Sequence, residues 1–317
     1  MTIENASRFS QRLQRSKVGI LTSGGLCPGT KNITRTIVNN VRARQIIGFN
    51  NGYRGLLTNG YTHLRTGNLE YDLGTSRVVF DPETIAFHLN IYDLETIFVI
   101  GGEGSLAGAS KLIEHTDTQI VGLPKTIDND IFGIDYSFGH NSAVEETLRF
   151  IDSGYIQARS YNTVSVVKVM GRDSGFIALN SSLAHGDVDI TLVPEEDYNC
   201  DGILDRIRYT MLSKKSCLIV VAEGVDICDM LLHRIPNITG KHVKYIEPGH
   251  FVRTCEANAY DKRYCNLLAK TAIDAIQETK ESFVVGQKDG VIQQLPFDTL
   301  QCGMRKTLSS ADINMLP

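Results

Sequence analysis

Short apolar runs that end directly in glycine-rich turns recur along this chain, and an amphipathic stretch follows each turn. The first run covers residues 18–22 and leads into Ser-Gly-Gly-Leu-Cys-Pro-Gly, after which Ile33, Ile37 and Val41 fall on one helical face. Buried parallel strands that alternate with covering helices have this pattern. The sequence therefore predicts an α/β fold with mainly parallel sheets.

The same pattern returns between residues 96 and 123. An apolar strand over 96–100 leads into the turn Gly-Gly-Glu-Gly-Ser at 101–105, which is followed by a helix to about His115 and a second strand over 119–123. Strand, helix and strand in this order form a βαβ unit.

Further strands are predicted from apolar runs later in the chain. They cover residues 163–169, 217–222 and 243–246. The stretch 186–204, which contains Pro194 and an Asp-Gly pair, is predicted to be a partly exposed connection. The whole pattern predicts a doubly wound parallel architecture.

Composition narrows the possible partners. The 317 residues carry a net charge of -4, so no global basic field favours nucleic acid or an acidic membrane surface. Seven cysteines without a C-x-x-C pair are expected to be reduced thiols. The first residues do not resemble a signal peptide and no apolar run is long enough to span a membrane, so we expect a cytoplasmic protein.

Both glycine turns are candidate phosphate sites. In open α/β sheets, ligands bind beyond the carboxyl ends of the strands, where glycine lets the backbone approach a phosphate and helix N-termini supply N–H groups. Neither turn has the spacing of a dinucleotide fingerprint, and the first lacks the Lys-Ser/Thr pair of a Walker loop. Each turn taken alone is equally consistent with a tight connection that binds nothing.

A pair of carboxylates follows the predicted strand 119–123. If the segment 124–130 is extended, its period of two puts Thr126, Asp128 and Asp130 on one side. One carboxylate can then accept a proton from an alcohol while the other helps to hold Mg²⁺, and Lys125 can meet phosphate charge, as phosphoryl transfer requires. The alternative is an Asx-type turn with capping roles only.

Several motifs in order resemble the phosphofructokinase family, and together they cover nearly the whole chain. They are the first glycine turn from Thr22 to Gly29, Gly74 to Arg77, Gly101 to Ser105, Pro124 to Asp130 (PKTIDND), Met170 to Arg172, Ala222 to Gly224, and the segment around Arg253.

The resemblance implies two doubly wound, Rossmann-like domains with mainly parallel sheets. The phosphoryl-donor domain is expected over residues 1–138 and 257–300, and the sugar-phosphate domain over 139–256 and 301–317. It further implies a cytoplasmic homo-oligomer, a dimer or a tetramer, that works in glycolysis.

The resemblance also implies the reaction, which transfers the γ-phosphoryl group of Mg-ATP to the 1-hydroxyl of fructose 6-phosphate. Asp128 is implied as the base, and the other implied catalytic residues are Thr126, Asp130 and Arg172. The implied ATP and phosphate contacts are Gly24, Gly25, Tyr53, Arg77, Gly102, Gly104, Ser105 and Lys125. The implied sugar contacts are Thr126, Asp128, Met170, Gly171, Arg172, Glu223 and Arg253.

Two positions bear on the donor and the metal. Gly104 resembles the ATP-dependent members, in which a missing side chain leaves room for the α-phosphate. Glu103 stands where the family usually has a metal-associated Asp, so Glu103 and Asp130 are the candidate Mg²⁺ carboxylates.

The alternative functions are a pyrophosphate-dependent enzyme and a weakly catalytic regulatory subunit. A Rossmann-type dehydrogenase is disfavoured, since the fingerprint and its ribose-binding acid are missing.

Overall fold

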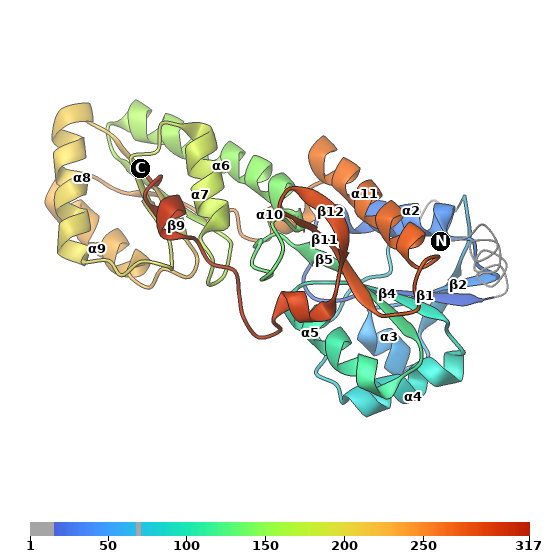
Figure 1. The fold of residues 1–317 in the computed structure, drawn as a ribbon. Coiled ribbons are helices and arrows are strands. Elements are labelled where there is room, and N and C mark those ends of the chain that lie inside the picture. Colours follow the sequence, from blue (N-terminus) through green and yellow to red (C-terminus); the bar gives the residue numbers. More distant parts are fainter. Residues whose placement is uncertain (1–15, 68–70) are drawn as a thin grey trace. The chain divides into compact units, whose positions relative to one another are not determined.

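The chain forms two compact units. The computed structural model describes residues 16–67 and 71–317, and Figure 1 shows its ribbon. Unit 1 comprises Met1–Thr126, Ile131–Gly139 and Glu256–Arg305, and unit 2 comprises Ile127–Asp130, His140–Cys255 and Lys306–Pro317. The segment that carries Asp128 therefore groups with unit 2, although the strand before it belongs to unit 1.

Unit 1 is built on an eight-stranded sheet. Its inner strands are parallel, and two antiparallel strands, β12 and β3, close its edges. In sheet order the strands are β12 (Val291–Leu295), β11 (Phe283–Lys288), β5 (Gln119–Thr126), β4 (Thr96–Gly101), β1 (Lys17–Thr22), β2 (Gln45–Phe49) and β3 (Tyr61–Leu64), and the short β6 (Phe138–Gly139) pairs with β5.

Helices cover both faces of this sheet (Figure 1). One face carries α2 (Thr30–Asn40) packed on α11 (Ala259–Ala275), and the other carries α3 (Tyr53–Leu57), α4 (Pro82–Tyr92) and α5 (Glu103–Leu112). Two 3₁₀ turns add to the unit, at Ile113–His115 and Phe297–Leu300. The central strand β4 is buried along its whole length, which explains why Thr96 is its one polar residue.

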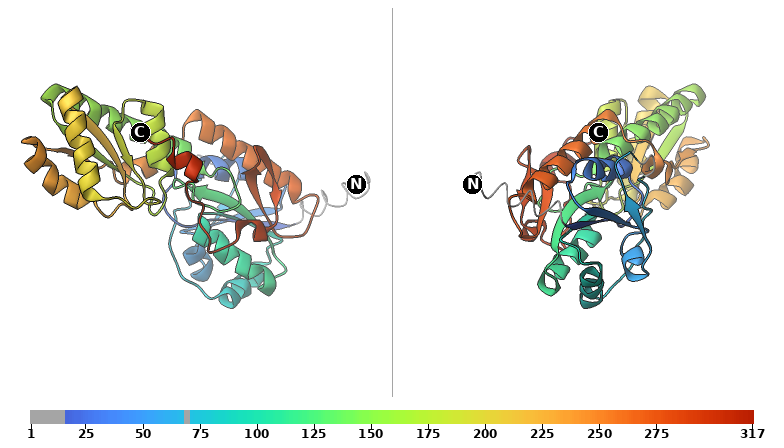
Figure 2. Two further views of the ribbon diagram at one scale, coloured as in Figure 1. Left: turned by 60° about the vertical axis from the view of Figure 1, so that its left-hand side comes forward. Right: turned by 90° about the vertical axis from the view of Figure 1, so that its right-hand side faces the viewer.

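Unit 2 has a four-stranded parallel sheet. Its order is β10 (Lys244–Ile246), β7 (Val164–Val169), β9 (Cys217–Ala222) and β8 (Ile190–Leu192). Helices pack in two pairs, visible in both views of Figure 2. They are α6 (His140–Tyr161) with α7 (Phe176–His185), and α8 (Cys200–Lys214) with α9 (Cys228–Thr239); the short helices are α10 (Phe251–Thr254) and α12 (Ser310–Ile313).

The predicted fold class is confirmed, and so is the βαβ unit, because β4, α5 and β5 follow one another and the two strands pair in parallel. The prediction for residues 186–204 was wrong in part. This stretch contains the buried strand β8 and the first turns of α8, and a three-residue strand is too short to leave a periodic signal. The sequence analysis also missed β2, β3, β11 and β12.

All seven cysteines are free thiols, as expected. In the part of the chain that the structure describes, no helix is both long enough and apolar enough to cross a membrane.

Burial of apolar side chains in the central strands should stabilise unit 2. Leu218 in β9 is 1% exposed, whereas Leu212 in α8 is 80% exposed. We expect Leu218→Ala to cost roughly 2–5 kcal/mol through lost burial and a residual cavity. The matched surface change Leu212→Ala should cost less than about 0.5 kcal/mol. Urea unfolding of both variants measures the difference, and equal midpoints would contradict this assignment of the core.

Candidate active site

The first glycine turn of unit 1 is tied to the loop that carries Arg77. Gly24 has a positive φ of 92°, which favours glycine. Its N–H donates to the carbonyl of Ser76 at 3.0 Å, and its own carbonyl accepts from Thr75 Oγ1 at 2.8 Å. Thr22 adds a third tie through its hydroxyl, which donates to the carbonyl of Gly74. These bonds fix the loop 74–77 beside the turn, with the Arg77 side chain exposed at its end.

Four predicted phosphate contacts converge at the carboxyl ends of the inner strands. Lys125, near the end of β5, donates from Nζ to the carbonyl of Gly25 at 2.5 Å. A Cβ placed on Gly24 would lie 3.6 Å from Ser105 Oγ and 3.9 Å from Lys125 Nζ. The two glycine turns and one cationic side chain thus lie within a few ångströms of one another. This combination of backbone N–H groups and a positive charge can bind phosphate.

The second glycine turn leads into α5, and there is open space beside one of its glycines, Gly104. Gly102 precedes the helix, and Gly104 lies in its first turn. A Cβ added at Gly104 would meet no atom within 4 Å, so the space beside it can accept a ligand. Glu103, the first residue of the helix, uses Oε1 to accept the N–H of Gly303 at 3.1 Å.

Tyr53 is hydrogen-bonded to this turn through its hydroxyl. The side chain is 1% exposed and packs on Phe80 with ring centroids 4.2 Å apart. Its hydroxyl donates to the carbonyl of Ser105 at 3.2 Å, and burial raises the pKa of the phenol above its ordinary value. We therefore place Tyr53 among the residues that hold the turn, because its ring is covered by protein.

In unit 2, Asp128 lies near two predicted substrate contacts, Arg172 and Arg253. Its carboxylate is buried, with Oδ2 3.8 Å from Arg172 Nε and Oδ1 3.9 Å from Arg253 Nη2. Both distances exceed the usual range of a hydrogen bond, so the two guanidinium groups act on the carboxylate through their charge. Opposite charges at this distance favour the ionised form of the carboxylate, which is the form that can accept a proton.

The turn that carries Arg172 is strained and closely packed. Arg172 has a positive φ of 53°, and its N–H donates to Glu223 Oε1 at 2.6 Å. Gly224 cannot carry a side chain here, because a Cβ would lie 2.3 Å from the carbonyl oxygen of Arg172. Such backbone conformations persist only where the surrounding structure holds them, and they cluster at functional sites. The turn therefore brings together two predicted sugar contacts, Arg172 and Glu223.

Met170 and Gly171 come just before this Arg. Arg253, which is 8% exposed, directs Nε at the Met170 sulfur at 3.3 Å. Gly171 has a φ of 142°, and a Cβ on it would lie 2.4 Å from the carbonyl oxygen of Ser174. The predicted sugar contacts from Met170 to Arg253 are thus gathered within unit 2.

Beyond Thr126 the segment that carries Asp128 and Asp130 is not extended. β5 ends at Thr126, and Asn129 takes a left-handed φ of 54°, so the alternation of side chains breaks between Asp128 and Asp130. Buried groups hold the segment instead: His140 Nδ1 lies 2.6 Å from the carbonyl oxygen of Ile127. The alternation therefore does not continue to Asp128 and Asp130, because the strand stops at Thr126 and the turn that the sequence left open as the alternative follows.

Several supporting residues have no sequence signal. Ser174 donates its hydroxyl to the backbone carbonyl of Asp128 at 3.0 Å, and His140 contacts Asn180 through Nε2 at 2.9 Å. A serine two residues after Arg172 and a histidine at the start of a helix are ordinary in sequence. Their contacts depend on segments far apart in the chain, which periodicity cannot reveal.

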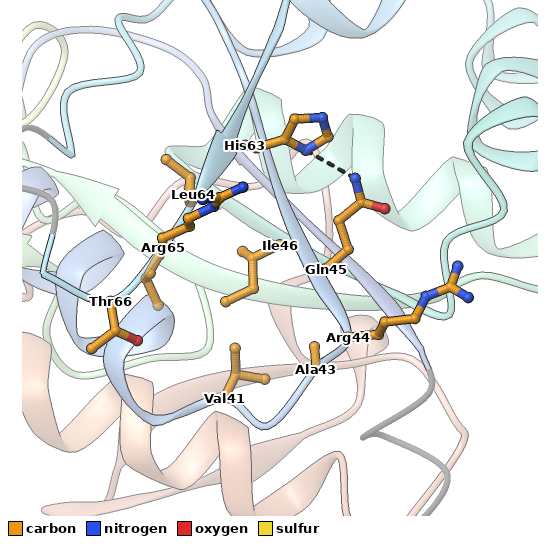
Figure 3. Close-up of a pocket in the computed structure, with 10 residues that line it drawn as sticks. Val41, Ala43, Arg44, Gln45, Ile46, His63, Leu64, Arg65 and Thr66 are labelled. Atoms are coloured by element: carbon orange, nitrogen blue, oxygen red, sulfur yellow. Dashed lines mark hydrogen bonds between the residues drawn. The ribbon is translucent and has the colours of Figure 1, made fainter.

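One cavity of unit 1 lies at the amino end of β2, away from the carboxyl ends of the strands where the glycine turns lie (Figure 3). It has a volume of about 630 Å³ and borders the amino end of β2, where Gln45 Nε2 contacts His63 Nδ1 at 2.9 Å. Arg44 and Arg65 contribute positive charge. Among the described residues that line it there is no predicted site residue, so this cavity is separate from the glycine turns.

Comparison with known proteins gives a consistent result. The family model described as Phosphofructokinase matches residues 17–276. A relative named ATP-dependent 6-phosphofructokinase 5, chloroplastic, from Arabidopsis thaliana is 36% identical over 83% of this chain and 57% of its own length. A second, from Trypanosoma cruzi and named ATP-dependent 6-phosphofructokinase, is 34% identical over 81% of this chain and 63% of its own length. The chain thus spans about three fifths of each of these relatives.

Solved structures agree on the fold. A pyrophosphate-dependent phosphofructokinase from Marinobacter aquaeolei matches with a TM-score of 0.82 at 19% identity, over 93% of this chain and 86% of that one. The phosphofructokinase from Saccharomyces cerevisiae matches with a TM-score of 0.82 at 24% identity, over 90% of this chain and 45% of that one. From its sequence match and its fold, this chain belongs to the phosphofructokinase family.

Proposed function

We propose that this chain is an ATP-dependent 6-phosphofructokinase. It would transfer the γ-phosphoryl group of ATP to the 1-hydroxyl of fructose 6-phosphate and yield ADP and fructose 1,6-bisphosphate. The observation that carries this proposal is the buried Asp128 carboxylate with an arginine nitrogen within 4 Å of each oxygen. The names of the relatives support both the reaction and the donor.

Asp128 acts as the base. As the sugar 1-hydroxyl attacks the γ-phosphorus, its proton passes to the Asp128 carboxylate, and the bond between the γ-phosphorus and the bridging oxygen of ADP breaks. Arg172 spreads positive charge toward the transferring oxygens, and Thr126 assists at the end of β5. Most of the rate enhancement in such transfers comes from positioning and charge stabilisation.

Unit 2 supplies the sugar contacts. Arg253 offers a planar guanidinium that suits the 6-phosphate dianion. Glu223 accepts sugar hydroxyls with its carboxylate, while one of its oxygens holds the N–H of Arg172. Met170 and Gly171 line the same site.

Unit 1 supplies the donor contacts. The glycine turns bring backbone N–H groups close to the phosphates, and Lys125 and Arg77 add positive charge. The residues proposed to contact phosphate are Gly24, Gly25, Arg77, Gly102, Gly104, Ser105 and Lys125. Open space beside Gly104 supports ATP over pyrophosphate, because a nucleotide needs room next to its α-phosphate.

Carboxylates of this chain suit Mg²⁺, which the donor would bring. Asp130 and Glu103 offer hard oxygen ligands, although one oxygen of Glu103 already accepts from Gly303. The described residues contain no group of three or more His, Cys, Asp or Glu side chains that could hold a metal. This fits an ion bound by one or two carboxylates and by substrate phosphates, where it neutralises phosphate charge.

Location and assembly are also proposals. A cytoplasmic homo-oligomer, dimeric or tetrameric, remains our expectation, although one relative is named as chloroplastic. A pyrophosphate-dependent enzyme and a weakly catalytic subunit are the alternatives, and the assays below separate all three.

Replacing the base should abolish turnover but spare sugar binding. We expect Asp128→Ala to lower kcat by roughly 10²- to 10⁴-fold, the range that general-base catalysis supplies. Fructose 6-phosphate should still bind, because Arg172 and Arg253 then carry uncompensated positive charge. A coupled assay and calorimetry measure the two effects, with Asp205→Ala on the exposed face of α8 as control. An Asp128→Ala variant with normal turnover would refute the assignment.

The donor preference should depend on Gly104. The unchanged chain should react faster with ATP than with pyrophosphate. Gly104→Asp should lower kcat/KM for ATP by roughly tenfold or more, because a carboxylate beside the α-phosphate adds bulk and like charge. Gly104→Ala is the matched control, since the site has room for a methyl group. If the ratio of ATP to pyrophosphate rates stays the same in Gly104→Asp, the steric explanation fails.

A further inference from the structure

Ser174 links the two parts of the sugar site in unit 2. It is 2% exposed and lies in the turn between β7 and α7. Its N–H donates to the carbonyl of Gly171 at 3.0 Å, which closes the turn, and its hydroxyl donates to the backbone carbonyl of Asp128 at 3.0 Å. One buried side chain thus joins the Arg172 turn to the backbone of Asp128.

Both partners of this link are held firmly on their other sides. The Arg172 turn is fixed by Glu223, and the next residue, Gly175, donates its N–H to Glu195 Oε1 at 3.0 Å. The segment 127–130 is fixed at its ends, by His140 at the carbonyl of Ile127 and by the N–H of Lys306 at the carbonyl of Asp130. Ser174 acts in the middle of that segment, at the residue that carries the base.

The base and the arginine are farther apart than in a hydrogen-bonded ion pair. A carboxylate and a guanidinium often approach to about 2.7–2.9 Å and form two parallel hydrogen bonds. Here Asp128 Oδ2 and Arg172 Nε stay 3.8 Å apart. A closed pair would occupy the oxygens that must receive the sugar proton, so a backbone that keeps the groups apart favours catalysis.

We propose that Ser174 is a positioning residue that holds Asp128 and Arg172 at this separation. The inference rests on the proposed kinase function. Without the hydroxyl, the Asp128 backbone loses its link to the turn, and the side chains are drawn together by their charges. The base would then be masked by the arginine, which lowers the rate of proton transfer but leaves the phosphate contact of Arg253 in place.

The test compares two buried serines of unit 2. Ser174→Ala should lower kcat by roughly 5- to 20-fold, the effect of losing one hydrogen bond that counts in the transition state, and leave the KM for fructose 6-phosphate within about twofold. Ser181→Ala is the matched control. It removes a hydroxyl that is 0% exposed and donates to the carbonyl of Ile177 within α7 at 2.6 Å, so it should change kcat little.

A second measurement separates an effect on the distance between Asp128 and Arg172 from a general loss of rigidity in the site. If Ser174 acts through the distance to Arg172, then Ser174→Ala should cost much less in an Arg172→Lys background, since lysine cannot form the two-bond pair. Equal kcat for the two serine variants, or fully additive effects with Arg172→Lys, would overturn the proposal.

If the wild-type chain has no activity on fructose 6-phosphate, the proposed function is wrong. Hydrogen exchange then decides the role of Ser174 independently of turnover. Amides of residues 127–130 should exchange at least threefold faster in Ser174→Ala than in Ser181→Ala. Identical exchange in both variants would overturn the link itself.

Discussion

A buried carboxylate that lies between two arginines is the constraint on which the sugar site of unit 2 depends. Asp128 is 4% exposed, and a lone ionised carboxylate in such a place would be costly. Two guanidinium groups offset this cost by their charge, yet neither is close enough to hydrogen-bond its oxygens. The buried links to its backbone and the strained turn of Arg172 both serve that arrangement.

Parallel sheets decide where such groups can gather. Every parallel strand of this sheet ends at the same edge, so the turns after β1, β4 and β5 meet although Gly25 and Lys125 are 100 residues apart in sequence. Glycine at these turns lets the backbone come close to a ligand, and Lys125 at the end of β5 reaches the turn after β1. The donor contacts therefore follow from topology, with few side chains involved.

The sequence predicts the parts of this structure that depend on burial along one strand. β9 is apolar throughout and β4 has only Thr96 as a polar residue, because both faces of each strand are covered, and a glycine turn marks where β4 ends. β2, with the sequence QIIGF, was missed although Asn51 and Gly52 follow it as a turn pair, because periodicity cannot distinguish so short an apolar run from a helix segment. The edge strands β3 and β12 are largely exposed and carry mixed residues, so their pattern is weak.

The candidate site was predictable only as a set of residue types. Asp128, Arg172 and Arg253 come from three separate segments, and the resemblance to a family, not spacing, suggested that they meet. The sequence left the segment after Lys125 open between an extended strand and an Asx-type turn, because Asn tolerates both extended and left-handed backbones; Asn129 takes the left-handed one. Ser174 and His140 gain their roles from tertiary contacts alone.

The path of the chain through the two units has a consequence for dissecting the protein. Unit 2 consists of three stretches, 127–130, 140–255 and 306–317, and the first holds only four residues. A continuous fragment of residues 140–255 would contain Arg172 and Arg253 but would lack Asp128. Any exchange of unit 2 between relatives must therefore carry this tetrapeptide along with 140–255 and 306–317.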